Sequence, residues 1–325
     1  MENQLFEHTI NDNEASIKKY IGKESFVTIP ETINDLKVTM IGVRAFGGCA
    51  MLEEVNIPET VTGIGREGFT NCTGLTTVVI SENITQLGER AFCGCTGLRH
   101  IKIPKGVSKV RAATFAGCTS LVDIELPEAL EFIGESAFGG SGITTITLPP
   151  NLSAIEHRAF SQCKRLTHIE VDARNQFYSS LDGVLFNKNG DTLIAFPSAK
   201  SGRYIIPNGV KKISDAAFAR CELIINITIT SSVTNIGIGA FAGCTGLSNV
   251  ELPHGVSRIG ACAFGNCKSL TAITIPESVT NLGRAAFKDC TALHSVVIPG
   301  FDNADGNLME FAFDGCSNLK SLSIY

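Results

Sequence analysis

The sequence lacks any cluster of positive charge. Lysine and arginine are scattered, with no run longer than Lys18-Lys19 or Lys211-Lys212, and the net charge is −5 at pH 7. Proteins that bind nucleic acid or an anionic membrane surface usually carry a basic patch that attracts the phosphate groups. We therefore expect no nucleic-acid partner.

Long apolar runs are also absent. No segment approaches the roughly 20 apolar residues of a membrane span, so no membrane insertion is expected. Residues 1–20 show neither the basic start nor the apolar stretch of a signal peptide. Two locations stay open: the cytoplasm if Met1 is native, and the cell surface or secretion if a leader was removed.

Motifs for catalysis, metals and cofactors are missing as well. The sequence contains no H-E-x-x-H, G-x-S-x-G or Walker A pattern. The pairs Cys93/Cys95 and Cys262/Cys267 do not have the C-x₂-C spacing of zinc sites. Residues 237–243 (GIGAFAG) resemble a dinucleotide loop only superficially, because the third glycine is misplaced. We expect no enzyme, no metal and no cofactor.

What the sequence does contain is a repeat of a phenylalanine, most often every 23 residues. Cysteine follows three residues later in ten of eleven copies, and Ser141 takes its place in the other. A fixed period of this length is typical of solenoids, in which each unit buries its apolar face against its neighbours. The two ladders are Phe46, Phe69, Phe92, Phe115, Phe138, Phe160, Phe218, Phe241, Phe264, Phe287 and Phe313, and Cys49, Cys72, Cys95, Cys118, Cys163, Cys221, Cys244, Cys267, Cys290 and Cys316.

Each repeat predicts the same local structure. The L-x-x-I-x-I segment alternates with period two and predicts a short strand, which the following proline ends. The Val-Thr-x-Ile element predicts a second extended piece. The A-F-x-x-C segment is too short for a proper helix and predicts one or two helical or 3₁₀ turns.

The full motif, C-x-x-L-x-x-I-x-I-P-x-x-V-T-x-I-G-x-x-A-F, resembles the BspA-like class of bacterial leucine-rich repeats. The resemblance implies a right-handed leucine-rich repeat solenoid, mostly β with short helical or 3₁₀ turns, of about 12 coils of 23 residues. It also implies a single domain, 1–325, made of an N-terminal capping hairpin (1–28), repeats (29–171), a hairpin insertion (172–206) and further repeats (207–325). Asn189-Gly190 marks the turn of the inserted hairpin, because both positions of such a turn need positive φ.

The ladder cysteines are expected to be reduced and buried. A disulfide requires a specific relative direction of the two Cα–Cβ bonds, and parallel side chains in register do not provide it. A free thiol, by contrast, packs as a small apolar group with a weak S–H donor. The phenylalanine row is similarly expected to be a core spine rather than a cofactor site.

The residues expected to face outward from the strands vary from coil to coil, whereas the inward ones do not. This pattern predicts a non-catalytic module that binds a protein ligand, since solenoids provide long recognition surfaces. The candidate partner-binding residues are His100, Lys102, Asp123, Glu125, His168, Glu170, Asn226, Asn249 and Glu251.

The resemblance implies adhesion to a host surface or matrix protein. The alternative is an intracellular or structural scaffold or spacer without its own ligand. A third hypothesis, a hydrolase at the inserted hairpin, would have to use Asp172, Asp182 and Asp191, the carboxylates of that segment.

The C-terminal coil, residues 313–325, ends on a predicted strand with no further repeat in the sequence to cover it. Residues 300–307 replace the usual Val-Thr-x-Ile-Gly element and predict the start of a cap, with Tyr325 shielding part of the edge. Because a bare strand edge invites pairing, we expect a monomer or weak self-association through this edge.

Overall fold

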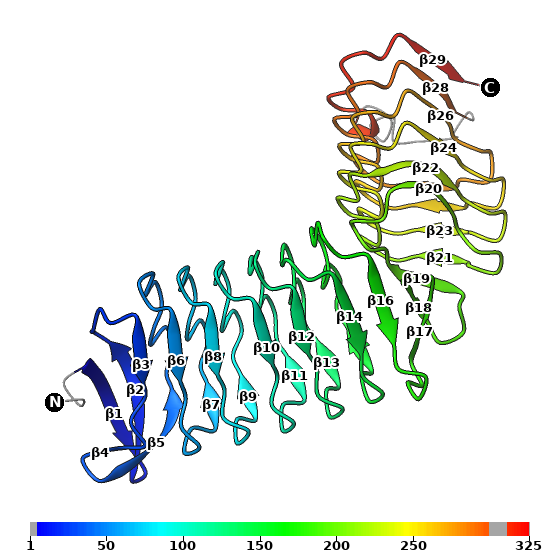
Figure 1. The fold of residues 1–325 in the computed structure, drawn as a ribbon. Helices are drawn as coiled ribbons and strands as arrows, with labels where there is room; N and C mark the ends of the chain where they lie inside the picture. The colour runs from blue at the N-terminus through cyan, green and yellow to red at the C-terminus, as the bar shows by residue number, and fades with distance from the viewer. Residues whose placement is uncertain (1–4, 299–310, 325) are drawn as a thin grey trace. The chain divides into compact units, whose positions relative to one another are not determined.

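A computed structural model describes residues 5–298 and 311–324 of the chain (Figure 1). The fold is a β-solenoid of about 12 turns of about 23 residues with almost no helix, as the repeat predicts. The chain divides into two compact units, Met1–Phe177 and Tyr178–Tyr325. We describe each unit separately, and the assignment of both to a single domain stays a prediction.

The first unit begins with the predicted capping hairpin. Strands β1 (Phe6–Asn11) and β2 (Glu14–Tyr20) pair in antiparallel fashion around Asp12 and Asn13, whose φ angles are 48° and 63°. β2 then pairs in parallel with β5 (Leu36–Ile41), and β4 (Thr32–Ile33) forms a second hairpin with β5. The cap thereby gives the first coil a strand to pair with.

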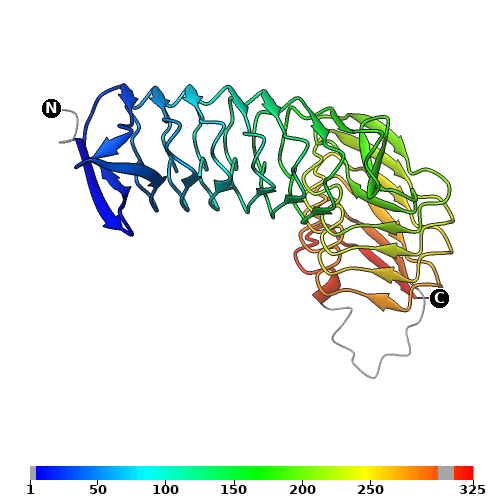
Figure 2. The ribbon, with the colours of Figure 1, turned by 90° about the horizontal axis from the view of Figure 1, so that it is seen from below.

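The coils of the first unit then stack with their strands in two rows (Figure 2). Equivalent residues stand side by side, as in the pairing of His100 with Asp123. The first row is β3 (Phe26–Thr28), β6 (Glu54–Asn56), β8 (Thr77–Val79), β10 (His100–Lys102), β12 (Asp123–Glu125), β14 (Thr145–Leu148) and β16 (His168–Val171). The second row is β7 (Gly63–Ile64), β9 (Gln86–Leu87), β11 (Lys109–Val110), β13 (Phe132–Ile133) and β15 (Ala154–Ile155).

The A-F-x-x-C segments form successive tight turns whose hydrogen bonds join residues three apart, as in a 3₁₀ turn, which is one of the two forms that the sequence predicts. In the coil of Phe46, the amide of Gly47 donates to the carbonyl of Arg44 at 2.9 Å, and that of Cys49 to the carbonyl of Phe46 at 3.1 Å. Arg44 (φ 56°) and Gly48 (φ 79°) adopt left-handed conformations on either side of Phe46, which interrupts a right-handed helix. The amide of Phe46 donates to the next coil instead.

The second unit begins with three antiparallel strands, β17 (Tyr178–Leu181), β18 (Val184–Asn187) and β19 (Thr192–Ala195). The inserted hairpin is therefore present around Asn189-Gly190, but only Gly190 adopts a positive φ (71°); its amide donates to the carbonyl of Asn187 at 3.0 Å, so Lys188 and Asn189 are the central residues of the turn. The sequence reasoning did not predict β17, although Asp182-Gly183, with φ angles of 50° and 72°, is a second hairpin turn. β19 pairs in parallel with β21 (Lys212–Ile213), as β2 does with β5. The insertion thus caps the second unit as the N-terminal hairpin caps the first.

The remaining coils of the second unit repeat the two rows. The last strand of the first row, β29, pairs in parallel with β28. The cap expected at residues 300–307 and at Tyr325 lies outside the described residues, and weak self-association at this end stays a prediction. The first row is β20 (Gly202–Ile205), β22 (Ile224–Thr228), β24 (Asn249–Glu251), β26 (Ala272–Thr274), β28 (Ser295–Ile298) and β29 (Ser321–Ile324); the second continues as β23 (Asn235–Ile236), β25 (Arg258–Ile259) and β27 (Asn281–Leu282).

A row of stacked phenylalanine rings runs through the core of each unit, beside buried isoleucine, leucine and valine side chains. From Phe46 to Phe160, neighbouring ring centroids are 4.8–5.8 Å apart, and from Phe218 to Phe313 they are 4.8–5.3 Å apart. An aromatic residue of each cap begins the row: Tyr20 stacks on Phe46, and Phe196 stacks on Phe218. Both rows therefore start from a capping hairpin.

The ladder cysteines bond one coil to the previous one. The Sγ of Cys72 donates to the carbonyl of Phe46 at 3.0 Å, and the same contact recurs from Cys95 to Phe69 and from Cys118 to Phe92. All twelve cysteines are free, and the ladder cysteines are buried except Cys49 and Cys316, the first and last of the row, which are partly exposed. Burial raises the pKa of the Cys118 thiol to about 12, which keeps it protonated as a donor.

Candidate functional site

The candidate residues of the first unit project from the first-row strands. In β10 and β12 the middle isoleucine is buried, and the residues on either side are exposed. This alternation follows from the pleat, which directs successive side chains to opposite faces. We call the exposed side the charged strand face; it consists of His100, Lys102, Asp123, Glu125, Thr145, Thr147, His168 and Glu170.

Parallel pairing in register brings half of this face into one cluster. The Nδ1 atom of His100 lies 3.1 Å from Oδ2 of Asp123, and its Nε2 atom lies 4.0 Å from Oε1 of Glu125. Lys102 reaches Glu82 of the preceding coil, with 3.7 Å between Nζ and Oε1. Since such exposed pairs contribute at most about 1 kcal/mol to stability, they can be changed without loss of the fold.

The other half of the face lies on β14 and β16. Thr145 pairs with His168 and Thr147 with Glu170, and the Nδ1 atom of His168 lies 3.0 Å from the hydroxyl of Thr167. Threonines thus separate the cluster at His100 from His168 and Glu170. The resulting surface offers donors, acceptors and both charge signs on a rigid ladder.

The remaining three candidates lie in the second unit. Asn226 pairs with Asn249, and Thr228 with Glu251, on β22 and β24. Asn249 and Glu251 are exposed, whereas Asn226 is half-buried. The candidate set therefore divides between the two units, and the role of these three residues stays a prediction.

Two of the three aspartates of the hydrolase hypothesis, Asp172 and Asp191, have structural partners. Arg174 donates to both oxygens of Asp172, at 2.9–3.0 Å, and these bonds lower the pKa of Asp172 to about 2. Hydrogen bonds from Asn187 and Thr192 lower the pKa of Asp191. Ionised carboxylates held in this way anchor loops and are poorly suited to proton transfer near neutral pH. Within residues 5–298 and 311–324, no three His, Cys, Asp or Glu side chains gather closely enough to hold a metal ion.

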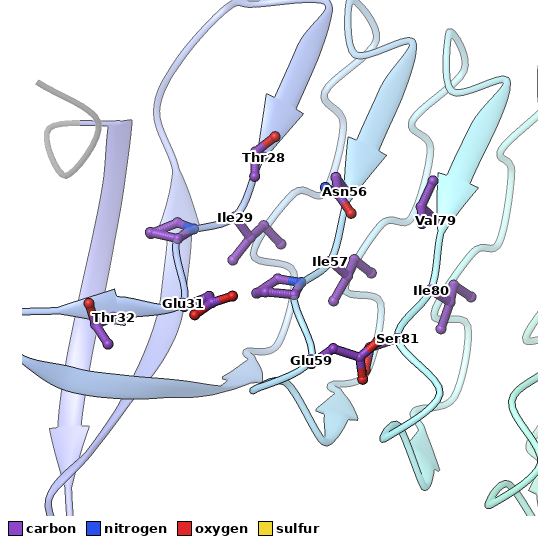
Figure 3. Close-up of a pocket in the computed structure, with 12 residues that line it drawn as sticks. Thr28, Ile29, Glu31, Thr32, Asn56, Ile57, Glu59, Val79, Ile80 and Ser81 are labelled. Atoms are coloured by element: carbon purple, nitrogen blue, oxygen red, sulfur yellow. The ribbon is translucent and has the colours of Figure 1, made fainter.

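One candidate site escaped the sequence reasoning: a hollow at the carboxyl ends of β3, β6 and β8, shown in Figure 3. It has a volume of about 690 Å³. We call it the N-terminal hollow; it is lined by Thr28, Ile29, Pro30, Glu31, Thr32, Asn56, Ile57, Pro58, Glu59, Val79, Ile80 and Ser81. The sequence departs from the repeat at two places near this hollow: residues are inserted around Asn34-Asp35, and Ser81 replaces the usual proline.

A second hollow, of about 500 Å³, lies on the turn side of the first unit, beside the nearly buried carboxylate of Glu67. Arg44 bonds to this carboxylate, and Arg66 lies 3.8 Å from it. The hydrogen bond from Arg44 lowers the pKa of Glu67. Because Glu67 is already satisfied within the chain, this cluster serves to join neighbouring coils.

None of the helical segments in the described part of the chain has the length and apolar character needed to span a lipid bilayer.

Comparison with known proteins agrees with the repeat. The family model described as "BspA type Leucine rich repeat region (6 copies)" matches residues 14–116, 39–167, 93–189 and 194–320. No curated protein matches the sequence.

Among solved structures, a leucine-rich cell surface protein from Faecalibacterium prausnitzii A2-165 is 32% identical, with a TM-score of 0.78 over 98% of this chain and 93% of that one. The pneumococcal vaccine antigen PcpA is 23% identical, with a TM-score of 0.84 over 100% and 87%. A leucine-rich repeat protein from Eubacterium ventriosum is 22% identical, with a TM-score of 0.63 over 97% and 81%. The last two likenesses concern the fold alone.

Proposed function

The chain belongs to the BspA-type leucine-rich repeat family, and from this premise we propose that it is a non-catalytic module that binds a protein partner through the charged strand face. Repeat proteins of this shape bind through extended surfaces whose side chains are held by the stacked coils.

The observation that carries the proposal is the contrast between the two faces of the same strands. On the inner face, Ile101, Ile124, Ile146 and Ile169 occupy equivalent buried positions. On the outer face, the aligned positions carry His, Asp, Thr and His. The fold requires the first set, whereas a solubilising role alone would not require the combination of histidine, carboxylate and hydroxyl groups in the second.

We further propose that the protein acts at the cell surface, in adhesion to host or matrix proteins. Support comes from the 32% identical relative, which is described as a leucine-rich cell surface protein. The competing proposal is a scaffold or spacer of the same fold without its own ligand. It predicts that substitutions on the charged strand face do not change the binding of any protein of the panel described next.

The test compares two variants on a panel of purified extracellular-matrix and host-surface proteins. The first, His100→Ala/Asp123→Ala/His168→Ala, alters the charged strand face; the control, Gln86→Ala/Lys109→Ala, alters exposed residues of the second row. The proposal predicts a panel protein that binds the wild type and the control but binds the first variant at least tenfold more weakly. Equal binding by all three proteins would refute it.

A further inference from the structure

The N-terminal hollow is distinct from the charged strand face, since it lies at the ends of β3, β6 and β8 and shares no residue with that face. The ionisable side chains that line it are both carboxylates, Glu31 and Glu59. Figure 3 shows Glu31 between Thr32 and the coil that carries Glu59, and Glu59 beside Ser81. The site therefore has one sign of charge, in a chain whose net charge is also negative.

The carboxylate of Glu59 is held in place by neutral donors. The hydroxyl of Ser81, which is 3% exposed, donates to its Oε2 atom at 3.1 Å, and Nδ2 of Asn83 donates to the same oxygen at 2.9 Å. Asn83 also fixes Ser81 through its backbone amide. These bonds orient the carboxylate without neutralising it, because neither donor carries a charge.

Carboxylates at equivalent positions of other coils pair with cationic side chains of the same chain. Glu31, Glu59, Glu82 and Glu128 occupy equivalent positions, three residues after the ends of β3, β6, β8 and β12. Nζ of Lys102 lies 3.7 Å from Oε1 of Glu82, and Nη2 of Arg174 donates a hydrogen bond to Oε1 of Glu128 at 2.8 Å. Among the residues that the structure describes, Glu31 and Glu59 have no such cation, and neither has Glu277 at the equivalent position after Pro276; Glu31 and Glu59 differ from Glu277 in lining the hollow together.

The hollow combines the two carboxylates with an apolar wall. Glu31 and Glu59 follow the ends of β3 and β6, which pair in register, so both carboxylates border the same hollow and attract a cationic group that enters it. Beside them, Ile29 and Ile57 are buried, and Pro30, Pro58 and the half-exposed Val79 supply an apolar wall. A lysine or arginine has the matching form, an aliphatic stem with a charged end.

We propose that the N-terminal hollow binds a lysine or arginine side chain presented by a protein partner. Carboxylate–cation pairing holds the charged end, and the side chains of Pro30, Pro58 and Val79 cover the stem. Thr32, the first residue of β4, lines one side, so the site belongs to the first coils.

The experiment uses the full-length ¹⁵N-labelled protein and the peptide acetyl-Gly-Gly-Lys-Gly-Gly-amide, with norleucine in place of lysine as the neutral control. We expect saturable chemical-shift changes at the amides of residues 28–32, 56–59 and 79–83 with the lysine peptide only. Glu31→Gln and Glu59→Gln should each raise Kd about two- to fivefold, the effect of losing one exposed ion pair. Both substitutions retain an oxygen acceptor, so Ser81 and Asn83 keep a partner.

Glu128→Gln is the matched control, because it alters an equivalent carboxylate that Arg174 already occupies; it should leave Kd unchanged. The proposal is overturned if the norleucine peptide produces the same shifts, or if Glu31→Gln/Glu59→Gln binds the lysine peptide as tightly as the wild type. Either outcome would leave the proposal for the charged strand face intact, because that test uses other residues.

Discussion

Replacing Phe115 with alanine would remove one ring from the middle of the stacked row in the first unit. Phe115 is fully buried, and its ring stacks between those of Phe92 and Phe138 at centroid distances of 5.7 and 5.8 Å. Loss of a buried phenylalanine side chain typically costs about 3–5 kcal/mol, because transfer energy is lost and a cavity remains. We expect the upper part of this range, since the stacked coils on both sides restrict collapse around the gap.

Urea unfolding followed by far-ultraviolet circular dichroism measures this loss, and the absence of tryptophan makes this signal preferable to fluorescence. At a slope of about 3 kcal/mol/M, the midpoint should fall by about 1–2 M. Thr119→Ala, an exposed change in the same coil, should stay within about 0.5 kcal/mol of the wild type. A loss below about 1 kcal/mol for Phe115→Ala would refute the ring row as a principal source of stability.

Three further predictions follow from the same core. In native alkylation with mass spectrometry, exposed Cys262 should react first, and buried Cys72, Cys118 and Cys244 only after denaturation; rapid labelling of the buried thiols would contradict the packing. Burial raises the pKa of Cys118 and Cys221 to about 12 and that of Cys163 to about 11. Because unfolded thiols lose their proton near pH 8.5, the free energy of unfolding should fall from about pH 9 towards pH 12. The fall should be less steep in Cys118→Ala, which has one buried thiol fewer. A fragment of residues 178–325 should fold alone, because β17, β18 and β19 supply its cap; a random-coil circular dichroism spectrum would show that it needs the first unit.

The repeat was readable from sequence because periodicity reports which side chains face inward. The phenylalanines and isoleucines recur at fixed intervals, and stacking in register is the arrangement that buries them all. The turn conformation was less accessible. Arg44, Glu67 and Arg90 adopt positive φ, which residue preferences do not indicate, because contacts between coils impose it.

The sites depend on departures from the repeat, and these were harder to interpret. The charged strand face follows from strand alternation, so its residues could be named in advance, although the pairing of His100 with Asp123 needed the register. The N-terminal hollow depends on the hairpin at Asn34-Asp35 and on Ser81 replacing proline. Each departure is visible in the sequence, but only the structure brings them to one place.

Photo-crosslinking tests the binding claim most directly. A benzoylphenylalanine placed at Thr147, an exposed position of the charged strand face, is compared with one at Lys109, an exposed position in the second strand row. Our account predicts that an extracellular-matrix or host-surface protein is crosslinked from position 147 and not from position 109. Crosslinking from position 109 alone, or from neither position, would contradict it.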